Sequence, residues 1–89
     1  MIIRYTPAFL RSVQKLDSDI RDKVFDQIEI FGKNPKHPSL KMHKLKGKWS
    51  GFCAFSIGVK WRVIFEKIKS GKSEVVLLHQ AGSHDIYRP

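Results

Sequence analysis

The chain has 89 residues, of which 42% are hydrophobic and 28% are charged. This length and composition are typical of one globular domain, so we expect a single domain over residues 1–89 and exclude a disordered or collagen-like chain. No apolar run approaches the roughly 18 residues of a membrane span, and no secretory signal opens the sequence. The one cysteine, Cys53, cannot form an internal disulfide. We therefore expect a cytoplasmic protein that does not contact a membrane.

Positive charge is concentrated in the second part of the chain. Seventeen lysine and arginine residues against eight acidic residues give a net charge of +9. Residues 1–29 contain five basic and five acidic side chains, whereas residues 30–89 contain twelve basic and three acidic ones. A basic surface of this kind attracts polyanions, so nucleic acid is the leading partner class. An acidic protein and an anionic lipid surface are the alternatives.

Two helices are predicted in the first third of the chain, after a short strand at Ile2–Tyr5. The pair Thr6-Pro7 is typical of a helix N-terminus, because threonine caps free N–H groups and proline needs no donor at the first helical position. Apolar residues at helical spacing predict one helix that ends near Leu16 and a second over about 18–31, ended by a glycine. The connection between these two helices is short, which predicts an antiparallel helical hairpin.

Three strands are predicted after a lysine-rich segment without regular structure. They are separated by turns at Gly58 and at Ser70-Gly71, and they cover Phe52–Ile57, Trp61–Glu66 and Glu74–His79. Short connections make neighbouring strands antiparallel.

Residues 80–89 are interpreted as a polar tail in which Gly82 allows a sharp redirection. The order of elements predicts an α+β fold. In it, an N-terminal helical hairpin packs on one face of a mostly antiparallel sheet of about four strands.

Two of the four histidines are candidates for acid–base chemistry. Lysines surround His43, which favours its neutral, proton-accepting form, whereas Asp85 beside His84 favours the charged form. Such a pair can act as general base and general acid. The alternative is that both are exposed loop residues without a role. His37 is interpreted as a solvated loop residue and His79 as a half-buried structural one. No histidine pair has the spacing of metal ligands, so we expect no metal and no cofactor.

Arg62 and Tyr87 are the other candidates. The strand period of two places Arg62 with Ile64 on the face opposite the larger apolar side chains, and a guanidinium suits a phosphate. The alternative for Arg62 is a structural pair with Glu66 or Asp85. Tyr87 can stack on a base or orient a phosphate, or it can anchor the tail.

Three segments together carry a family resemblance: Leu45–Phe52 (LKGKWSGF), Trp61–Phe65 (WRVIF) and His84–Tyr87 (HDIY). They resemble the RelE/ParE superfamily of toxins from bacterial and archaeal toxin–antitoxin modules, over nearly the whole chain and with features of the YafQ, YoeB and RelE types. The resemblance implies two N-terminal helices on an antiparallel sheet, as in small microbial ribonucleases. It also implies metal-independent cleavage of messenger RNA on the ribosome.

The resemblance also implies roles for individual residues. His43 matches a catalytic histidine of YafQ-like toxins, where YoeB-like toxins have a glutamate, and we assign it as the base. His84 matches the C-terminal catalytic histidine and is the acid, Arg62 stabilises the phosphate, and Tyr87 orients or stacks on the substrate. Five lysines are expected to hold the RNA or ribosomal RNA backbone: Lys41, Lys44, Lys46, Lys48 and Lys60.

The chain departs from the individual subtypes. It has Cys53 and Phe55 where RelE has two functional lysines, and Ser56 and Lys60 where YafQ has a further histidine and an aspartate. The sequence therefore mixes features of several subtypes.

The implied reaction is a transesterification in which the RNA 2′-OH attacks the adjacent phosphate, so RNA and not DNA is the substrate. The implied partners are messenger RNA, the ribosome and a cognate antitoxin of a type II module, with the toxin a monomer alone or part of a heteromeric complex. One alternative is a ParE-like toxin that inhibits DNA gyrase without cutting RNA. Another is an RNA-binding domain without activity.

Overall fold

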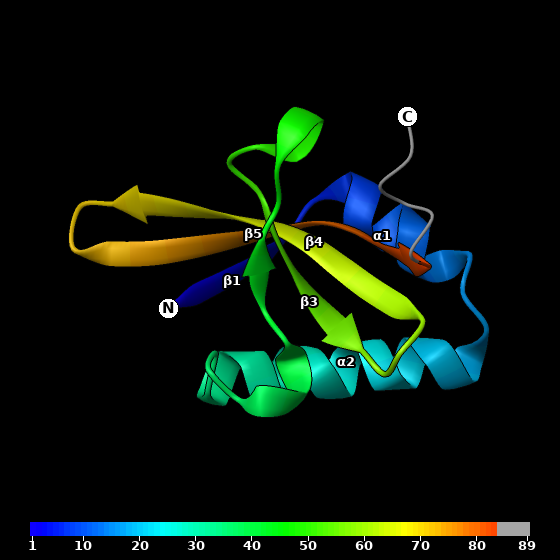
Figure 1. The fold of residues 1–89 in the computed structure, drawn as a ribbon. Helices are drawn as coiled ribbons and strands as arrows, with labels where there is room; N and C mark the ends of the chain where they lie inside the picture. The colour runs from blue at the N-terminus through cyan, green and yellow to red at the C-terminus, as the bar shows by residue number, and fades with distance from the viewer. Residues whose placement is uncertain (84–89) are drawn as a thin grey trace.

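The structure is a computed structural model that describes residues 1–83 (Figure 1). Its two α-helices follow the first strand, and a five-stranded sheet runs in the order β1-β5-β4-β3-β2. The elements in chain order are β1 (Ile2–Tyr5), α1 (Pro7–Gln14), α2 (Ser18–Lys33), the 3-10 helix η1 (Pro38–Leu40), β2 (His43–Lys44), the 3-10 helix η2 (Gly47–Trp49), β3 (Cys53–Ile57), β4 (Trp61–Ser70) and β5 (Ser73–Ser83). The predicted α+β class with N-terminal helices is confirmed.

The sheet is antiparallel except at one edge. There β1 pairs parallel with β5, in the register Ile2↔Val75 to Tyr5↔Leu78, and the helical hairpin connects β1 to the rest of the sheet. The pairs β2–β3, β3–β4 and β4–β5 are antiparallel. The prediction of about four strands was one short, because the two-residue strand β2 was interpreted as part of a loop.

Both long strands exceed their predicted lengths. The prediction that residues 80–83 belong to a polar tail was wrong: they continue β5, and Gly82 lies inside the strand opposite Arg62. Pairing with β4 supplies the backbone hydrogen bonds of this segment and Ala81 packs in the core, so the strand continues although its other residues are polar or glycine. The far ends of β4 and β5 form an exposed hairpin that extends away from the helices (Figure 1).

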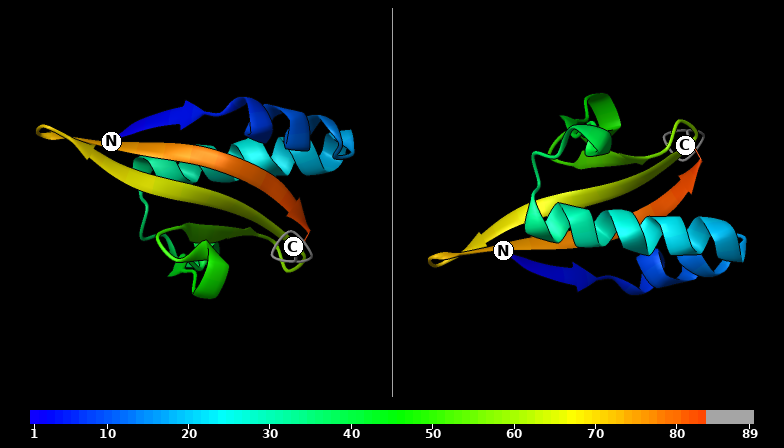
Figure 2. Two further views of the ribbon diagram at one scale, coloured as in Figure 1. Left: turned by 90° about the horizontal axis from the view of Figure 1, so that it is seen from above. Right: turned by 90° about the horizontal axis from the view of Figure 1, so that it is seen from below.

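The two helices cover the same face of the sheet (Figure 2). Helix α1 begins as predicted, because the Thr6 hydroxyl accepts a hydrogen bond from the Phe9 N–H at 3.1 Å. The same hydroxyl donates to the Leu78 carbonyl at 2.9 Å and so fastens the helix start to β5. Among the described residues, no helix is long and apolar enough to cross a membrane.

The core lies between the helices and this face of the sheet. Its centre is a cluster of three fully buried rings, in which Phe31 of α2 lies 5.0 Å from both Phe55 and Phe65, measured between ring centroids. Buried side chains on the helix-facing side of β3, β4 and β5 complete the core, together with buried side chains from α1, α2 and η1. The other face of the sheet is left without a helix in the described part of the chain.

A bulge distorts the β4–β5 ladder on that second face. Ile64 pairs with Gln80 and Phe65 with Leu78, so His79 has no direct partner on β4. Its Nε2 atom lies 3.1 Å from the Glu66 carboxylate, and its ring contacts Phe52 edge-on at 5.2 Å between centroids. The prediction of a half-buried, structurally satisfied His79 is confirmed.

Ser12 offers a direct test of how α1 is fastened to β5. Beyond the end of β1, the Ala81 N–H on the outer edge of β5 donates to the Ser12 hydroxyl at 2.9 Å, and this hydroxyl donates to the Phe9 carbonyl at 2.7 Å. Ser12→Ala leaves that N–H without its protein acceptor, so we expect a loss of about 1–3 kcal/mol in the free energy of unfolding. Urea denaturation measures it.

The matched control is Ser70→Ala, at an exposed position in the β4–β5 hairpin. We expect this change to stay within about 0.5 kcal/mol of the parent. Equal stability of the Ser12 and Ser70 variants would contradict the proposed role of the Ser12 hydroxyl.

Candidate functional site

The face of the sheet opposite the helices brings two predicted site residues together. Directly paired residues in antiparallel strands point to the same side, and His43 pairs with Ala54, which pairs with Ile64. Arg62 lies two residues before Ile64 on β4 and therefore shares this face. His43 and Arg62 are separated by two strand spacings and are offset by two residues along the strands, so their Cα atoms are about 12 Å apart. The Arg62 guanidinium is directed toward the β3–β4 turn, so contact of both groups with one phosphodiester requires it to leave the carbonyls of Val59 and Trp61.

The neighbours of Arg62 on the adjacent strands are small, whereas Ile64, next to it on the same face of β4, is large and fully buried. Ala54 and Ser56 occupy β3, and Gly82 faces Arg62 from β5. Ala54 and Ser56 are buried, with exposed fractions of 0% and 2%. No bulky side chain of β3 or β5 therefore stands beside the guanidinium in its own row. The sequence alone did not reveal these small neighbours of Arg62, because identifying them requires the register of three strands.

His43 is exposed, and one of its ring nitrogens contacts the backbone. Its Nδ1 atom lies 3.1 Å from the carbonyl oxygen of Lys41. A carbonyl only accepts hydrogen bonds, so Nδ1 carries the proton and the neutral ring has its free electron pair on Nε2. A ring in this state can accept a proton at Nε2, which is the property that a general base requires.

Arg62 is half-buried and turned toward the β3–β4 turn. Its Nη1 atom donates to the carbonyls of Val59 at 3.0 Å and Trp61 at 2.8 Å. No carboxylate of residues 1–83 forms an ion pair with it. The alternative of a structural pair with Glu66 was wrong, since Glu66 contacts His79. The other alternative, Asp85, lies outside the described residues. Two backbone contacts through one nitrogen leave the other guanidinium nitrogens without an acceptor in residues 1–83.

His84 and Tyr87 lie outside the described residues, so their predicted roles remain predictions. The strand that precedes them ends at Ser83, which pairs with Trp61, one residue from Arg62.

The five predicted RNA-binding lysines are all exposed, but they do not share one surface. Lys44 pairs with Cys53, which packs against the core, so its side chain leaves the sheet on the side opposite His43. There it lines a hollow of about 390 Å³ together with Lys67, which the sequence analysis did not single out. The Lys60 ammonium lies 5.1 Å from the centroid of the Trp61 ring. Lys46 and Lys48 lie in and beside η2.

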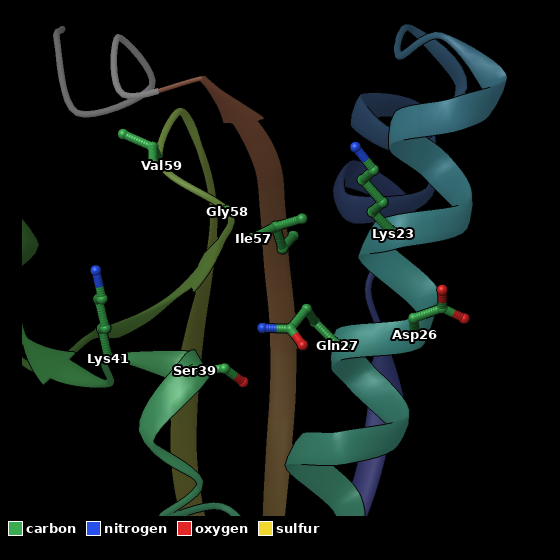
Figure 3. A pocket seen from close by; sticks show the side chains of 8 residues that line it. All are labelled: Lys23, Asp26, Gln27, Ser39, Lys41, Ile57, Gly58 and Val59. Carbon is green, nitrogen blue, oxygen red and sulfur yellow. The ribbon is translucent and has the colours of Figure 1, made fainter.

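A larger groove of about 510 Å³ lies between α2 and the β3–β4 turn (Figure 3). Lys23 and Gln27 line it from α2, Lys41 from the segment after η1, and Ile57 and Val59 from the other wall. The side chain of Gln27 closes one part of it by donating to the Ser56 carbonyl at 3.0 Å. No motif in the sequence pointed to this groove, because its walls meet only through the packing of α2 beside β3.

Residues 1–83 contain no group of three or more histidine, cysteine, aspartate or glutamate side chains that could hold a metal ion.

Comparison of the sequence with protein-family models and with curated proteins gave no match. Solved structures do match. YafQ from Escherichia coli is similar with a TM-score of 0.76 and 18% identity, over 98% of this chain and 97% of that chain. A YoeB/ParE toxin from Agrobacterium tumefaciens gives a TM-score of 0.73 and 22% identity, over 94% and 99%.

The toxin–antitoxin complex RelBE2 from Mycobacterium tuberculosis gives a TM-score of 0.73 and 15% identity, over 93% of this chain and 96% of that chain. At identities this low, the matches establish the fold alone. They span nearly the full length of both chains in each comparison. The fold that the three sequence segments predicted is therefore confirmed: the chain has the RelE/YafQ/YoeB-type toxin fold.

Proposed function

We propose that the chain is a single-domain, cytoplasmic toxin of a type II toxin–antitoxin module, and that it is a metal-independent messenger RNA endoribonuclease acting on the ribosome. The observation that carries the proposal is the shared sheet face, on which the exposed Nε2 of His43 and the guanidinium of Arg62 flank small residues. A net charge of +9 supports a polyanionic substrate.

The proposed reaction uses the 2′-OH of the RNA as nucleophile. The Nε2 of His43 removes the 2′-OH proton, and the oxygen attacks the adjacent phosphorus to form a 2′,3′-cyclic phosphate. The departing 5′-oxygen takes a proton from His84. Arg62 stabilises the negative charge that develops on the phosphate oxygens, which its charge and forked donors suit. Tyr87 orients or stacks on the substrate.

Substrate binding is proposed to depend on the exposed lysines. Lys46 and Lys48 lie two and four residues after the end of β2. Lys60 lies in the turn just before β4, two residues from Arg62. These three are proposed to hold the RNA or ribosomal RNA backbone at the site, and Lys41 and Lys44 to do so at its margins. RNA binding should therefore weaken as the salt concentration rises.

A cognate antitoxin is the proposed protein partner. Two of the similar solved structures are toxin–antitoxin complexes, RelBE2 and DinJ–YafQ. We propose that the chain is a monomer alone and forms a heteromeric complex with its antitoxin, and that the basic surface of the toxin attracts an acidic segment of that partner.

Incubation with programmed ribosomes tests the proposed activity. We expect new 5′ ends in the message at the codon in the ribosomal A site. Intact message would remove the nuclease proposal. Intact message combined with gyrase-dependent DNA breaks in cells would favour the ParE-like alternative instead.

His43→Ala and His43→Gln test the assigned base. Each removes the proton acceptor at Nε2, so we expect cleavage on ribosomes to slow by about 100-fold or more. The control is Gln14→Ala, which changes an exposed polar side chain on α1 outside the site. Equal rates for the His43 variants and the parent would show that another group is the base.

Arg62→Lys and Arg62→Gln test the phosphate contact. Lysine retains the charge but not the forked donors, so we expect both variants to lose about 100-fold in single-turnover rate, with the glutamine variant the slower. Arg11→Gln on α1 removes an exposed arginine outside the site and serves as control. Because Arg62 also holds the β3–β4 turn, thermal unfolding must show that each variant is folded. A folded Arg62→Gln variant with the parent rate would contradict the assignment.

A further inference from the structure

Lys41 has an unusual backbone conformation. Its φ of 47° and ψ of 43° are left-handed, and among residues 1–83 it is the one non-glycine residue with positive φ. Side chains crowd the backbone in this region, and asparagine, aspartate and glycine occupy it far more readily than lysine. A residue is held there only when the surrounding structure determines its conformation.

The residues around Lys41 supply that constraint. Leu40 is fully buried in the core, and the Lys41 N–H donates to the Pro38 carbonyl at 3.2 Å, which closes η1. Only two residues later, β2 begins with the pairing of His43 and Ala54. The chain must therefore pass from a 3-10 helix into a strand within two residues, and the left-handed residue makes this change of direction.

The same conformation aims the Lys41 carbonyl at His43, whose Nδ1–H donates to it at 3.1 Å. The side chain of Lys41 is not involved. It lines the groove beside α2, across from Lys23 of that helix (Figure 3). The contact with His43 therefore depends on the backbone of Lys41 and not on its ammonium group.

We infer that Lys41 is a positioning residue for His43: its left-handed backbone holds the imidazole as the Nδ1–H tautomer and so keeps the Nε2 electron pair free. The consequence for catalysis rests on the proposed ribonuclease function. The effect on the tautomer does not depend on that function.

Two substitutions at position 41 separate the effect of the backbone conformation from the effect of the side chain. Lys41→Gly and Lys41→Val both remove the ammonium. Glycine adopts positive φ without crowding, whereas a β-branched residue strongly disfavours it. Long-range ¹⁵N–¹H correlation spectra of the histidine rings, recorded above the titration range, report which nitrogen carries the proton. The His43→Gln spectrum identifies the His43 signals.

We expect the Nδ1–H tautomer of His43 in the parent and in Lys41→Gly, and a mixture with the Nε2–H tautomer in Lys41→Val. The inference is overturned if folded Lys41→Val keeps the Nδ1–H tautomer, or if Lys41→Gly loses it as fully as Lys41→Val. If Lys41→Val does not fold, Lys41→Ala takes its place, because alanine also disfavours positive φ, and the same two outcomes apply.

Cleavage rates on ribosomes then connect the tautomer to the reaction. Because both variants lack the ammonium, their ratio isolates the backbone effect, and we expect Lys41→Val to be at least about tenfold slower than Lys41→Gly. Equal rates with different tautomers would overturn the catalytic part of the inference. If His43→Ala also cleaves at the parent rate, the failure lies in the proposed function, and the positioning of the ring by Lys41 stands on the spectra.

Discussion

The antiparallel pairing of β2, β3 and β4 determines which side chains share a surface. β2 has only two residues, and its pairs His43↔Ala54 and Lys44↔Cys53 set the imidazole on the face opposite the helices and Lys44 on the other. A shift of one residue would exchange the two, because consecutive strand residues point to opposite sides. The proposed chemistry depends on this register. The register in turn depends on the buried Leu40 and the left-handed Lys41 that deliver the chain to β2.

The two faces of the sheet have different physical tasks. One face, with Phe55 and Phe65 at its centre, packs against both helices and supplies the apolar burial that stabilises so short a chain. The other has small residues beside its functional groups and holds His79 at a bulge, against Glu66 and Phe52. The second face is also packed in part, because Ala54, Ser56 and Ile64 on it are buried.

Local signals predicted the parts of the fold that depend on near neighbours. Thr6-Pro7 marked the start of α1, helical spacing marked both helices, and strand alternation placed Arg62 opposite the larger apolar residues of β4. The errors lie where distant segments decide the structure. The strand β2 is polar and the last four residues of β5 are polar or small, so their partners on β3 and β4 make them strands. For the same reason, the sequence grouped Lys44 with His43 although the sheet separates them.

Binding of a substrate analogue that cannot be cleaved tests the central claim most directly. An RNA oligonucleotide with a 2′-deoxy residue at the scissile position lacks the nucleophile but keeps the phosphate. Titration followed by NMR of the histidine and arginine side chains should shift the His43 ring and the Arg62 guanidinium together, with one common dissociation constant. Shifts confined to the groove between α2 and the β3–β4 turn, with His43 and Arg62 unchanged, would contradict a shared phosphodiester site on the sheet.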